Sequence, residues 1–110
     1  MSSLSTHVLD TGLGKPARGI RVALERANDG ESLGTGVTDA DGRVREFPPM
    51  RGTLADGEYR LRFAVGDYFA TTRRDTFYSE IVIAFRVAGD GHYHVPLLLS
   101  PFGYSTYRGS

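Results

Sequence analysis

The chain has 110 residues, of which 40% are hydrophobic and 24% charged, so we expect one globular domain over 1-110. Thirteen Lys and Arg balance thirteen Asp and Glu. This balance offers no basic surface for nucleic acid or an anionic membrane, and we expect neither as a partner. The lack of cysteine excludes disulfides, thiolate metal ligands and a cysteine nucleophile. No apolar run approaches membrane-spanning length and no secretory signal precedes Leu4, from which we predict a cytoplasmic protein.

The first half of the chain reads as short strands separated by turn residues. Alternation of apolar and polar residues predicts strands over residues 4–9 and 20–25. Asn28-Asp29-Gly30 is a hairpin signal, which predicts a partner strand over 33–38. The turn residues 39–42 then lead into a short strand over 43–47, which the following prolines end.

The second half continues the pattern and contains the only predicted helix. Tyr59, Leu61, Phe63 and Val65 alternate and predict a strand with these side chains inward. Asp67 fits the N-cap of a short helix over 68–74. Further strands are predicted over 81–87, 92–100 and 104–107. Seven to eight short strands with one short helix indicate an all-β, antiparallel β-sandwich.

The three histidines are the first candidates for chemistry: His7, His92 and His94. Alternation places His7 on one face of its strand with Ser5, and His92 with His94 on one face of theirs. Both faces of the 92–100 strand carry apolar residues. One covers the core, and the other is most simply covered by another subunit. An imidazole that is partly shielded from water there can have a shifted pKa. The alternative interpretation is an ordinary surface or interface histidine that makes a hydrogen bond.

The histidines, the turn over 38–42 and the two arginines also allow other interpretations. His-x-His with His7 as a third ligand is compatible with zinc, although no acidic partner is identifiable. Residues 38–42 resemble the start of a calcium loop but lack the remaining ligands, which favours a plain turn. Arg43 follows this turn at a strand start, where its guanidinium can hold a planar acyl-urea or carboxylate through two hydrogen bonds. A solvated arginine is the alternative there and for Arg108.

The C-terminal residues form the last candidate feature. Tyr107, Arg108 and Ser110 bring an aromatic hydroxyl, a guanidinium and a carboxylate close together after an apolar strand. Such a group can line a polar pocket for a small molecule. We therefore expect a small-molecule site near this end of the chain.

Several motifs together resemble the transthyretin-like 5-hydroxyisourate hydrolase family. They are Leu4-Ser5-Thr6-His7-Val8-Leu9-Asp10, Gly14-Lys15-Pro16-Ala17, Thr38-Asp39-Ala40-Asp41-Gly42-Arg43, Gly57-Glu58-Tyr59-Arg60, Gly66-Asp67-Tyr68-Phe69, His92-Tyr93-His94-Val95-Pro96-Leu97-Leu98-Leu99-Ser100 and Tyr107-Arg108-Gly109-Ser110. They follow one another in order and span essentially the whole chain. The resemblance implies a transthyretin-like fold of two four-stranded sheets and one helix. It also implies a homotetramer, a dimer of dimers around a central channel.

The resemblance implies the activity as well. It is hydrolysis of 5-hydroxyisourate to 2-oxo-4-hydroxy-4-carboxy-5-ureidoimidazoline in urate breakdown, without a metal or organic cofactor. The implied catalytic residues are His7, Arg43 and His94. We assign His7 as general base and His94 as the residue that orients water or substrate, with Arg43, Tyr107, Arg108 and Ser110 contacting the substrate. The alternative function is a transthyretin-like small-molecule carrier without catalysis.

Overall fold

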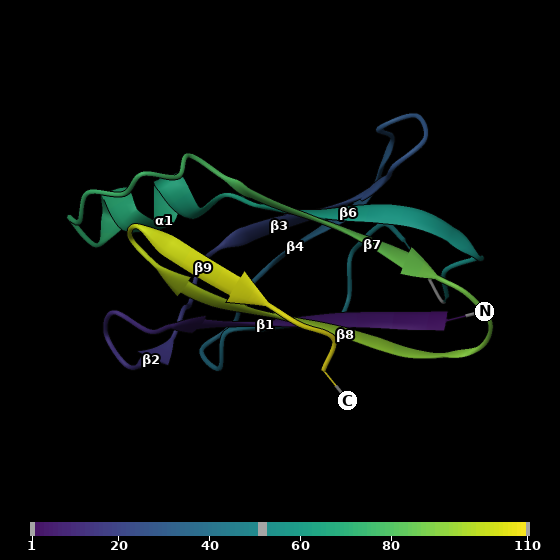
Figure 1. The fold of residues 1–110 in the computed structure, drawn as a ribbon, viewed down its shortest axis with the longest axis horizontal. Helices are drawn as coiled ribbons and strands as arrows, with labels where there is room; N and C mark the ends of the chain where they lie inside the picture. Colours follow the sequence, from purple (N-terminus) through teal and green to yellow (C-terminus); the bar gives the residue numbers. More distant parts are fainter. Residues whose placement is uncertain (1, 51–52, 110) are drawn as a thin grey trace.

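A computed structural model of the chain describes residues 2–50 and 53–109 and arranges them as two β-sheets with one short helix (Figure 1). The first sheet contains β1 (Ser2–Asp10), β2 (Lys15–Pro16), β5 (Arg43–Val44), β8 (Gly91–Ser100) and β9 (Gly103–Thr106). The second contains β3 (Arg21–Arg26), β4 (Ser32–Val37), β6 (Gly57–Phe63) and β7 (Ile81–Val87). The helix α1 (Val65–Thr71) lies at one end of the two sheets. The predicted all-β sandwich with one short helix is confirmed, but the described residues form nine strands instead of seven to eight, and the first sheet has five strands instead of the four that the resemblance implied.

The order of the strands brings the two ends of the chain together. The second sheet runs β4-β3-β6-β7, with antiparallel neighbours. The first runs β2-β1-β8-β9, and β5 also pairs with β1. Within it β1 and β8 are parallel, which departs from the purely antiparallel sandwich that the sequence predicted. Strands from opposite ends of the sequence thus become neighbours at the centre of this sheet.

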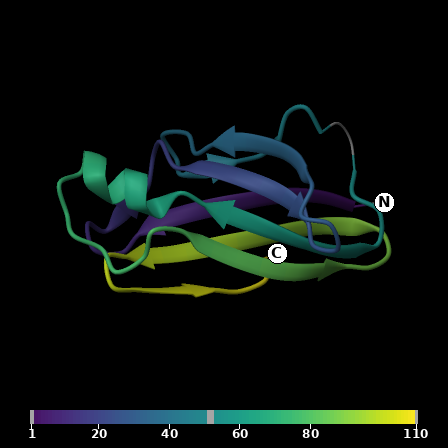
Figure 2. The same cartoon turned by 90° about the horizontal axis from the view of Figure 1, so that it is seen from above.

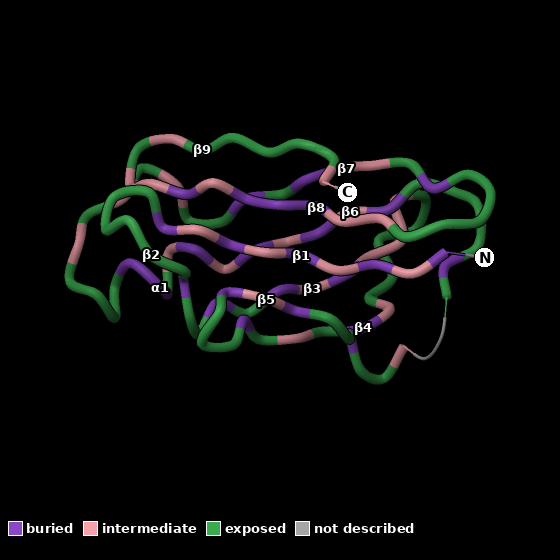
Figure 3. Tube along the Cα trace, turned by 90° about the horizontal axis from the view of Figure 1, so that it is seen from below, coloured by how far each residue is buried: buried purple, intermediate pink, exposed green. Residues whose placement is uncertain are grey.

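The core lies between the two sheets, and strand alternation decides which side chains enter it. Along β1 the even-numbered residues are buried and the odd-numbered residues from Ser3 to Leu9 are half-buried. Figure 2 shows the sheets from above, and Figure 3 shows the alternating burial along β1 and the mostly exposed β9 on the far side of β8. On β8, Val95, Leu97 and Leu99 face the core. The opposite face of this sheet, which we call the open face, carries the histidines.

The helix is displaced from its predicted position. The sequence placed it over 68–74 with Asp67 as N-cap, whereas it spans Val65–Thr71 and its N-cap is Ala64, which makes no side-chain capping bond. Val65, expected on a strand, starts the helix and is fully buried. Burial of Val65, Tyr68 and Phe69 sets the boundary, and Asp67 instead lies in the first turn, where its charge favours the helix dipole. None of the helices among residues 2–50 and 53–109 is long and apolar enough to cross a bilayer.

Candidate active site

His7 and Arg43 lie directly opposite each other on the open face. β1 and β5 form a short antiparallel pair in which His7 is the partner of Arg43. Paired residues of neighbouring strands have side chains on the same face of the sheet. Arg43 is half-buried, and none of the carboxylates in the described part of the chain lies within ion-pair distance of it. Its charge is therefore available to a bound group.

The turn before Arg43 is built to place it. The Asp39 carboxylate accepts hydrogen bonds from the backbone N–H groups of Asp41, at 2.9 Å, and Arg43, at 3.0 Å. These bonds hold the pKa of Asp39 below its ordinary value, against a smaller opposing effect of desolvation. Gly42 has φ of 75°, and a β-carbon there would lie 2.3 Å from the carbonyl oxygen of Val8. Only glycine fits this approach, so the residues that resembled a calcium loop form an Asx turn that docks against β1.

His94 joins the same face because the β1–β8 register pairs it with Ser5, which shares this face with His7. Its ring lies with its centroid 6.5 Å from that of His7. The hydroxyl of Ser5, its partner in the β1–β8 register, is 2.8 Å from His94 Nδ1. His94 is half-buried, whereas His92 on the same strand is exposed. The structure therefore brings together the three predicted catalytic residues, His7, Arg43 and His94.

The surroundings of His94 disfavour its charged form. Partial burial lowers the pKa of His94, and the positive Arg43 and the neighbouring His7 and His92 lower it further. A histidine with a depressed pKa is neutral at pH 7 and can accept a proton. Because Nδ1 is hydrogen-bonded to Ser5, Nε2 is the nitrogen available for that role.

The C-terminal segment packs directly over His94. Gly109 bridges to His94 in antiparallel pairing and donates its N–H to the His94 carbonyl at 2.8 Å. A β-carbon on Gly109 would lie 2.6 Å from His94 Cδ2 and 3.2 Å from Cγ of Pro96. The backbone at Gly109 therefore fixes one side of the imidazole. It also helps to bury Pro96, which the open face would otherwise expose.

The other predicted residues near the C-terminus do not all lie beside His7, Arg43 and His94. The guanidinium of Arg108 lies 4.3 Å from the ring centroid of Tyr93, a cation–π contact on the core side of β8. Arg108, Tyr107 and His94 line a cavity of about 320 Å³ that also contacts Phe85. Tyr107 is 58% exposed. Within one subunit Arg108 therefore does not join His7 and Arg43, and Ser110 lies outside the described residues.

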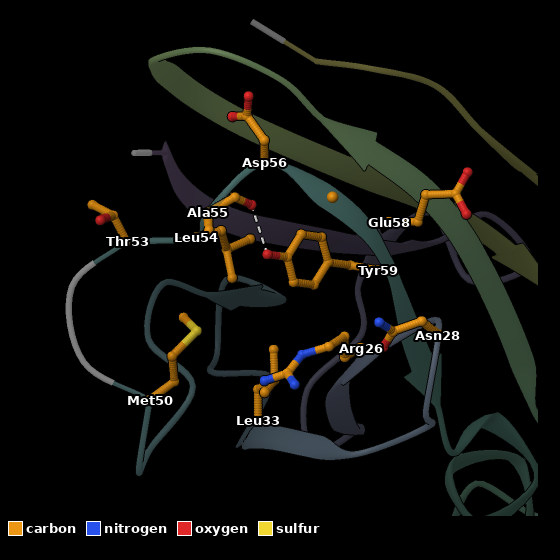
Figure 4. A pocket seen from close by; sticks show the side chains of 11 residues that line it. Arg26, Asn28, Leu33, Met50, Thr53, Leu54, Ala55, Asp56, Glu58 and Tyr59 are labelled. Atoms are coloured by element: carbon orange, nitrogen blue, oxygen red, sulfur yellow. Dashed lines mark hydrogen bonds between the residues drawn. The ribbon is translucent and has the colours of Figure 1, made fainter.

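A separate cavity of about 490 Å³ lies near the start of β6 (Figure 4). Arg26, Asp56, Glu58 and Tyr59 are among the residues that line it, and the Tyr59 hydroxyl donates to the Ala55 carbonyl at 2.6 Å. It contains none of the predicted catalytic residues. The convergent polar groups of the open face therefore make the better candidate site.

Metal binding was one alternative for the histidines. Between residues 2–50 and 53–109, no three His, Asp or Glu side chains are grouped so that they could hold a metal ion. The side chains nearest to the imidazoles are instead hydroxyls, from Ser3 and Ser5. The donor set offered to a metal is therefore poorer than the sequence spacing suggested.

Sequence reasoning missed three residues that shape this site. Ser3 and Ser5 contact the two histidines of β8, and Gly109 contacts His94. The two serines alternate with His7 on one predicted face, so a Ser-x-Ser-x-His pattern was present as a signal. Nothing in the sequence indicated that β8 would be the neighbour of β1.

Comparison with known proteins supports a common origin over the whole chain. A model of the HIUase/Transthyretin family matches residues 4–109. A 5-hydroxyisourate hydrolase of Caulobacter vibrioides is 49% identical over 118 residues, with 100% of each chain covered.

Two solved structures share the fold. Klebsiella pneumoniae 5-hydroxyisourate hydrolase has a TM-score of 0.91 and 42% identity, over 100% of this chain and 94% of that one. Sea bream transthyretin, solved with thyroxine, has a TM-score of 0.86 and 29% identity, over 97% of this chain and 94% of that one. The same architecture thus occurs in a hydrolase and in a protein that binds thyroxine.

Proposed function

This chain belongs to the HIUase/Transthyretin family, and we propose that it is an enzyme that hydrolyses 5-hydroxyisourate. The observation that carries the proposal is the convergence of His7, Arg43 and His94 on the open face, from three strands. The relative from Caulobacter vibrioides and the structure from Klebsiella pneumoniae both bear the name of this hydrolase. The proposed product is 2-oxo-4-hydroxy-4-carboxy-5-ureidoimidazoline, formed during urate breakdown.

The reaction needs two contributions from the protein. Water attacks the carbonyl of a cyclic acyl-urea, so a base must take a proton from water as the new C–O bond forms. The carbonyl oxygen gains negative charge at the same time and needs a positive or hydrogen-bonding partner. Both can be supplied by side chains, because an acyl-urea with a good nitrogen leaving group is already reactive.

Either His7 or His94 can be the base. The sequence-based assignment gave this role to His7 and the orienting role to His94, and it remains a prediction. The lowered pKa of His94 and its hydrogen-bonded Nδ1 favour the reverse, with Nε2 of His94 as proton acceptor and His7 orienting the water. We adopt this second arrangement as the working mechanism. The pH profiles of His7 and His94 variants distinguish the two.

Arg43 supplies the positive charge. Its planar guanidinium presents several N–H donors and stays protonated throughout the reaction. It lies opposite His7 in the β1–β5 pair, on the face from which the substrate would approach. We propose that it holds the planar substrate and polarises the carbonyl. Tyr107, Arg108 and Ser110 are proposed as further substrate contacts, contributed in the assembled protein.

We propose that the active form is a homotetramer, a dimer of dimers, in which another subunit covers the apolar end of the open face at Leu9 and Leu98 and leaves the end at His92 open to solvent. The open face carries Leu9 and Leu98, half-buried partners in the β1–β8 register, beside its polar groups. In the described chain β7 and β9 are edge strands that each pair on one side only. An unpaired edge and a partly apolar sheet face are both surfaces that association buries. A cytoplasmic location remains a prediction from the sequence.

A small-molecule carrier is the second candidate function, and the fold shared with thyroxine-bound sea bream transthyretin is the observation that favours it. A carrier needs shape complementarity but no proton acceptor beside a positive charge. The experiment that separates the two is a spectrophotometric assay with freshly generated 5-hydroxyisourate. Accelerated decay of the substrate above the buffer rate, lost in His94→Gln, is expected of the enzyme. Tight binding without acceleration would assign the chain to the carriers.

The assay also tests the zinc alternative. We expect full activity after exhaustive chelation and dialysis against metal-free buffer. Loss of activity on chelation, with recovery on addition of Zn²⁺, would replace the histidine mechanism by a metal-dependent one.

A further inference from the structure

Two serines and two histidines interleave on the open face of the first sheet. The parallel register places Ser3 opposite His92 and Ser5 opposite His94. Ser3 Oγ is 2.6 Å from His92 Nδ1, and Ser5 Oγ is 2.8 Å from both His92 Nε2 and His94 Nδ1. The four side chains therefore form one continuous hydrogen-bonded chain from Ser3, at its exposed end, to His94.

The chemistry of a hydroxyl restricts the protons in this chain. The Ser5 hydroxyl has one hydrogen to donate, so it cannot donate to both imidazoles at once. At least one of His92 Nε2 and His94 Nδ1 must therefore carry a proton and donate to Ser5 Oγ. When His94 Nε2 is the free base, Nδ1 is protonated and donates to Ser5, and the Ser5 hydroxyl is free to donate to His92 Nε2.

The charges around His94 point to proton transfer as the role of these hydrogen-bonded side chains. Positive Arg43 on β5 faces His94, as do His7 on β1 and His92 on β8, while Arg108 lines the neighbouring cavity. None of the described carboxylates makes a hydrogen bond or an ion pair with these imidazoles. An imidazolium at His94 would therefore be repelled by Arg43 and by the neighbouring imidazoles, which favours loss of a proton from the ring.

We propose that Ser5 and His92 are positioning residues that set the tautomer of His94 and carry the proton from its Nδ1 to solvent. His94 Nε2 takes a proton from the attacking water. The Nδ1 proton then passes to Ser5 Oγ as the Ser5 hydroxyl proton passes to His92 Nε2. The exposed His92, now an imidazolium, releases a proton to bulk water. As the C–N bond breaks, His94 Nε2 gives the proton it took from water to the departing nitrogen, while a proton from bulk water returns through His92 and Ser5 to His94 Nδ1. The starting tautomers are thereby restored, and the second hydrogen of the attacking water is released as the proton of the new carboxylic acid. The inference rests on the proposed function, since it assumes that His94 accepts the proton.

The first test removes the central hydroxyl. In Ser5→Ala we expect kcat to fall by about 10-fold or more, part of the roughly 10²–10⁴-fold contribution of general acid–base catalysis, with little change in KM. An imidazolium donates from both nitrogens, and a charge-assisted bond is the stronger one, so losing Ser5 Oγ should shift the acid limb of the kcat profile to lower pH. Ser5→Thr, which keeps a hydroxyl on a strand, should restore both.

A matched control distinguishes loss of the proton relay from general destabilisation of the fold. Ser100→Ala removes a serine hydroxyl from the same sheet, one that donates to the Gly103 carbonyl at 2.9 Å far from His94. It should leave kcat and the pH profile unchanged. Equal losses in Ser5→Ala and Ser100→Ala, or a failure of Ser5→Thr to recover activity, would overturn the relay in favour of general destabilisation.

The second test asks whether His92 is the residue that releases the proton to solvent. In His92→Asn the chain loses its proton carrier, and we expect a lowered kcat that rises again with the concentration of a small buffer such as imidazole. Wild-type kcat should not depend on buffer concentration. A His92→Asn enzyme with normal kcat in dilute buffer would remove His92 from the proton path.

A third measurement needs no activity at all. Nitrogen-15 NMR of histidine-labelled protein reports which nitrogen of each imidazole is protonated. We expect the His92 and His94 tautomers to change together with pH in the wild type and independently in Ser5→Ala. Coupled tautomers in a protein that does not hydrolyse 5-hydroxyisourate would refute the proposed function alone. If the protein hydrolyses 5-hydroxyisourate but the His92 and His94 tautomers change independently in the wild type, the relay alone would be refuted.

Discussion

Gly109 lies against the imidazole of His94 so closely that a β-carbon on Gly109 would come within 2.6 Å of His94 Cδ2. The contact holds one face of the ring while Ser5 holds its Nδ1. Two segments from opposite ends of the chain therefore fix the position of one side chain. Because catalysis depends on placement to within about 1 Å, this contact makes a sharp prediction.

Gly109→Ala should lower activity without unfolding the protein. The added methyl must displace either the His94 ring or the C-terminal segment, and a misplacement of about 1 Å can cost roughly 10²-fold in rate. Gly103→Ala is the matched control, since its β-carbon would meet only Ser100 Oγ, at 3.7 Å. Steady-state kinetics with 5-hydroxyisourate compare the two. Equal activity of both variants would mean that the C-terminal segment can move aside without a loss of rate.

The pH dependence identifies the base. Because the pKa of His94 is lowered from 6.5 by burial and by Arg43, the ring stays neutral at pH 7. Activity should be flat near pH 7 and fall only as pH drops through this lowered pKa. Stability linked to neutral His94 has the same sign, being present above pH 6.5 and lost as pH falls through the folded-state pKa.

Variants of the two histidines complete that test. His94→Gln should abolish the acid limb and reduce kcat by roughly 10²–10⁴-fold. His7→Ala should also reduce kcat, but the acid limb assigned to His94 should remain. If the limb instead disappears in His7→Ala and persists in His94→Gln, His7 is the base, as the sequence-based assignment held. Near-normal turnover of His7→Ala would remove it from the site.

Arg43→Ala should reduce kcat/KM by roughly 10²–10³-fold, the usual cost of losing a donor to a developing oxyanion. Arg45→Ala is a close control, because Arg45 is exposed and its ion pair among the described residues is with the Asp39 carboxylate, at 3.4 Å. We expect Arg45→Ala to be nearly as active as the wild type. Similar losses in both would indicate a general electrostatic attraction of the substrate instead of a specific contact.

A buried ion pair between Asp10 and Arg74 should stabilise the fold. Asp10 is fully buried at the end of β1, and it accepts from Arg74 Nη2 and from the Tyr68 hydroxyl, both at 2.6 Å. Burial alone would raise the pKa of Asp10, but bonds from Arg74, Tyr68 and the Leu13 N–H outweigh it and hold the pKa below 3.8. Burial and the Asp10 bond raise the pKa of Tyr68 to about 12.

Arg74→Ala should therefore lower the free energy of unfolding by roughly 3 kcal/mol, because it leaves a buried charge incompletely paired. Arg86→Ala, which breaks a pair with side chains 86% and 64% exposed, should change it little. Chemical denaturation at pH 7 measures both. The stability from Asp10 is present above pH 3.8 and is lost as pH falls through its depressed pKa, so the two variants should converge in strong acid.

Assembly is the last prediction. Covering the apolar end of the open face should require a second copy of the chain, so light scattering at micromolar concentration should give a tetramer. Leu98→Asp places a charge among the apolar residues of that face and should shift the mass toward smaller species. A fully active monomer would contradict both the tetramer and a site completed by a neighbouring subunit.

The sequence by itself determined most of the strands and their inward faces, although it missed β2 and predicted β5 too long, and it supplied the residues that we propose for the site. Alternation along β1 and β8 correctly separated the core residues from His7 and His94, because in a strand the period of two is a property of the backbone. The strand over Ile81–Val87 was predicted with its observed bounds. The helix was misplaced because burial of Val65 and Phe69 set its boundaries, and no local capping signal reports that burial.

Only the tertiary structure decided which strands are neighbours. Alternation assigns a face within one strand but says nothing of its partner or its register, which depend on how the two sheets pack. The parallel pairing of β1 with β8 puts Ser5 beside His94, 89 positions away in the sequence. The same packing puts Arg108 against Tyr93 on the core side, away from His7. Local sequence therefore indicated the candidate residues, and the long-range pairing of β1, β5 and β8 brought His7, Arg43 and His94 together.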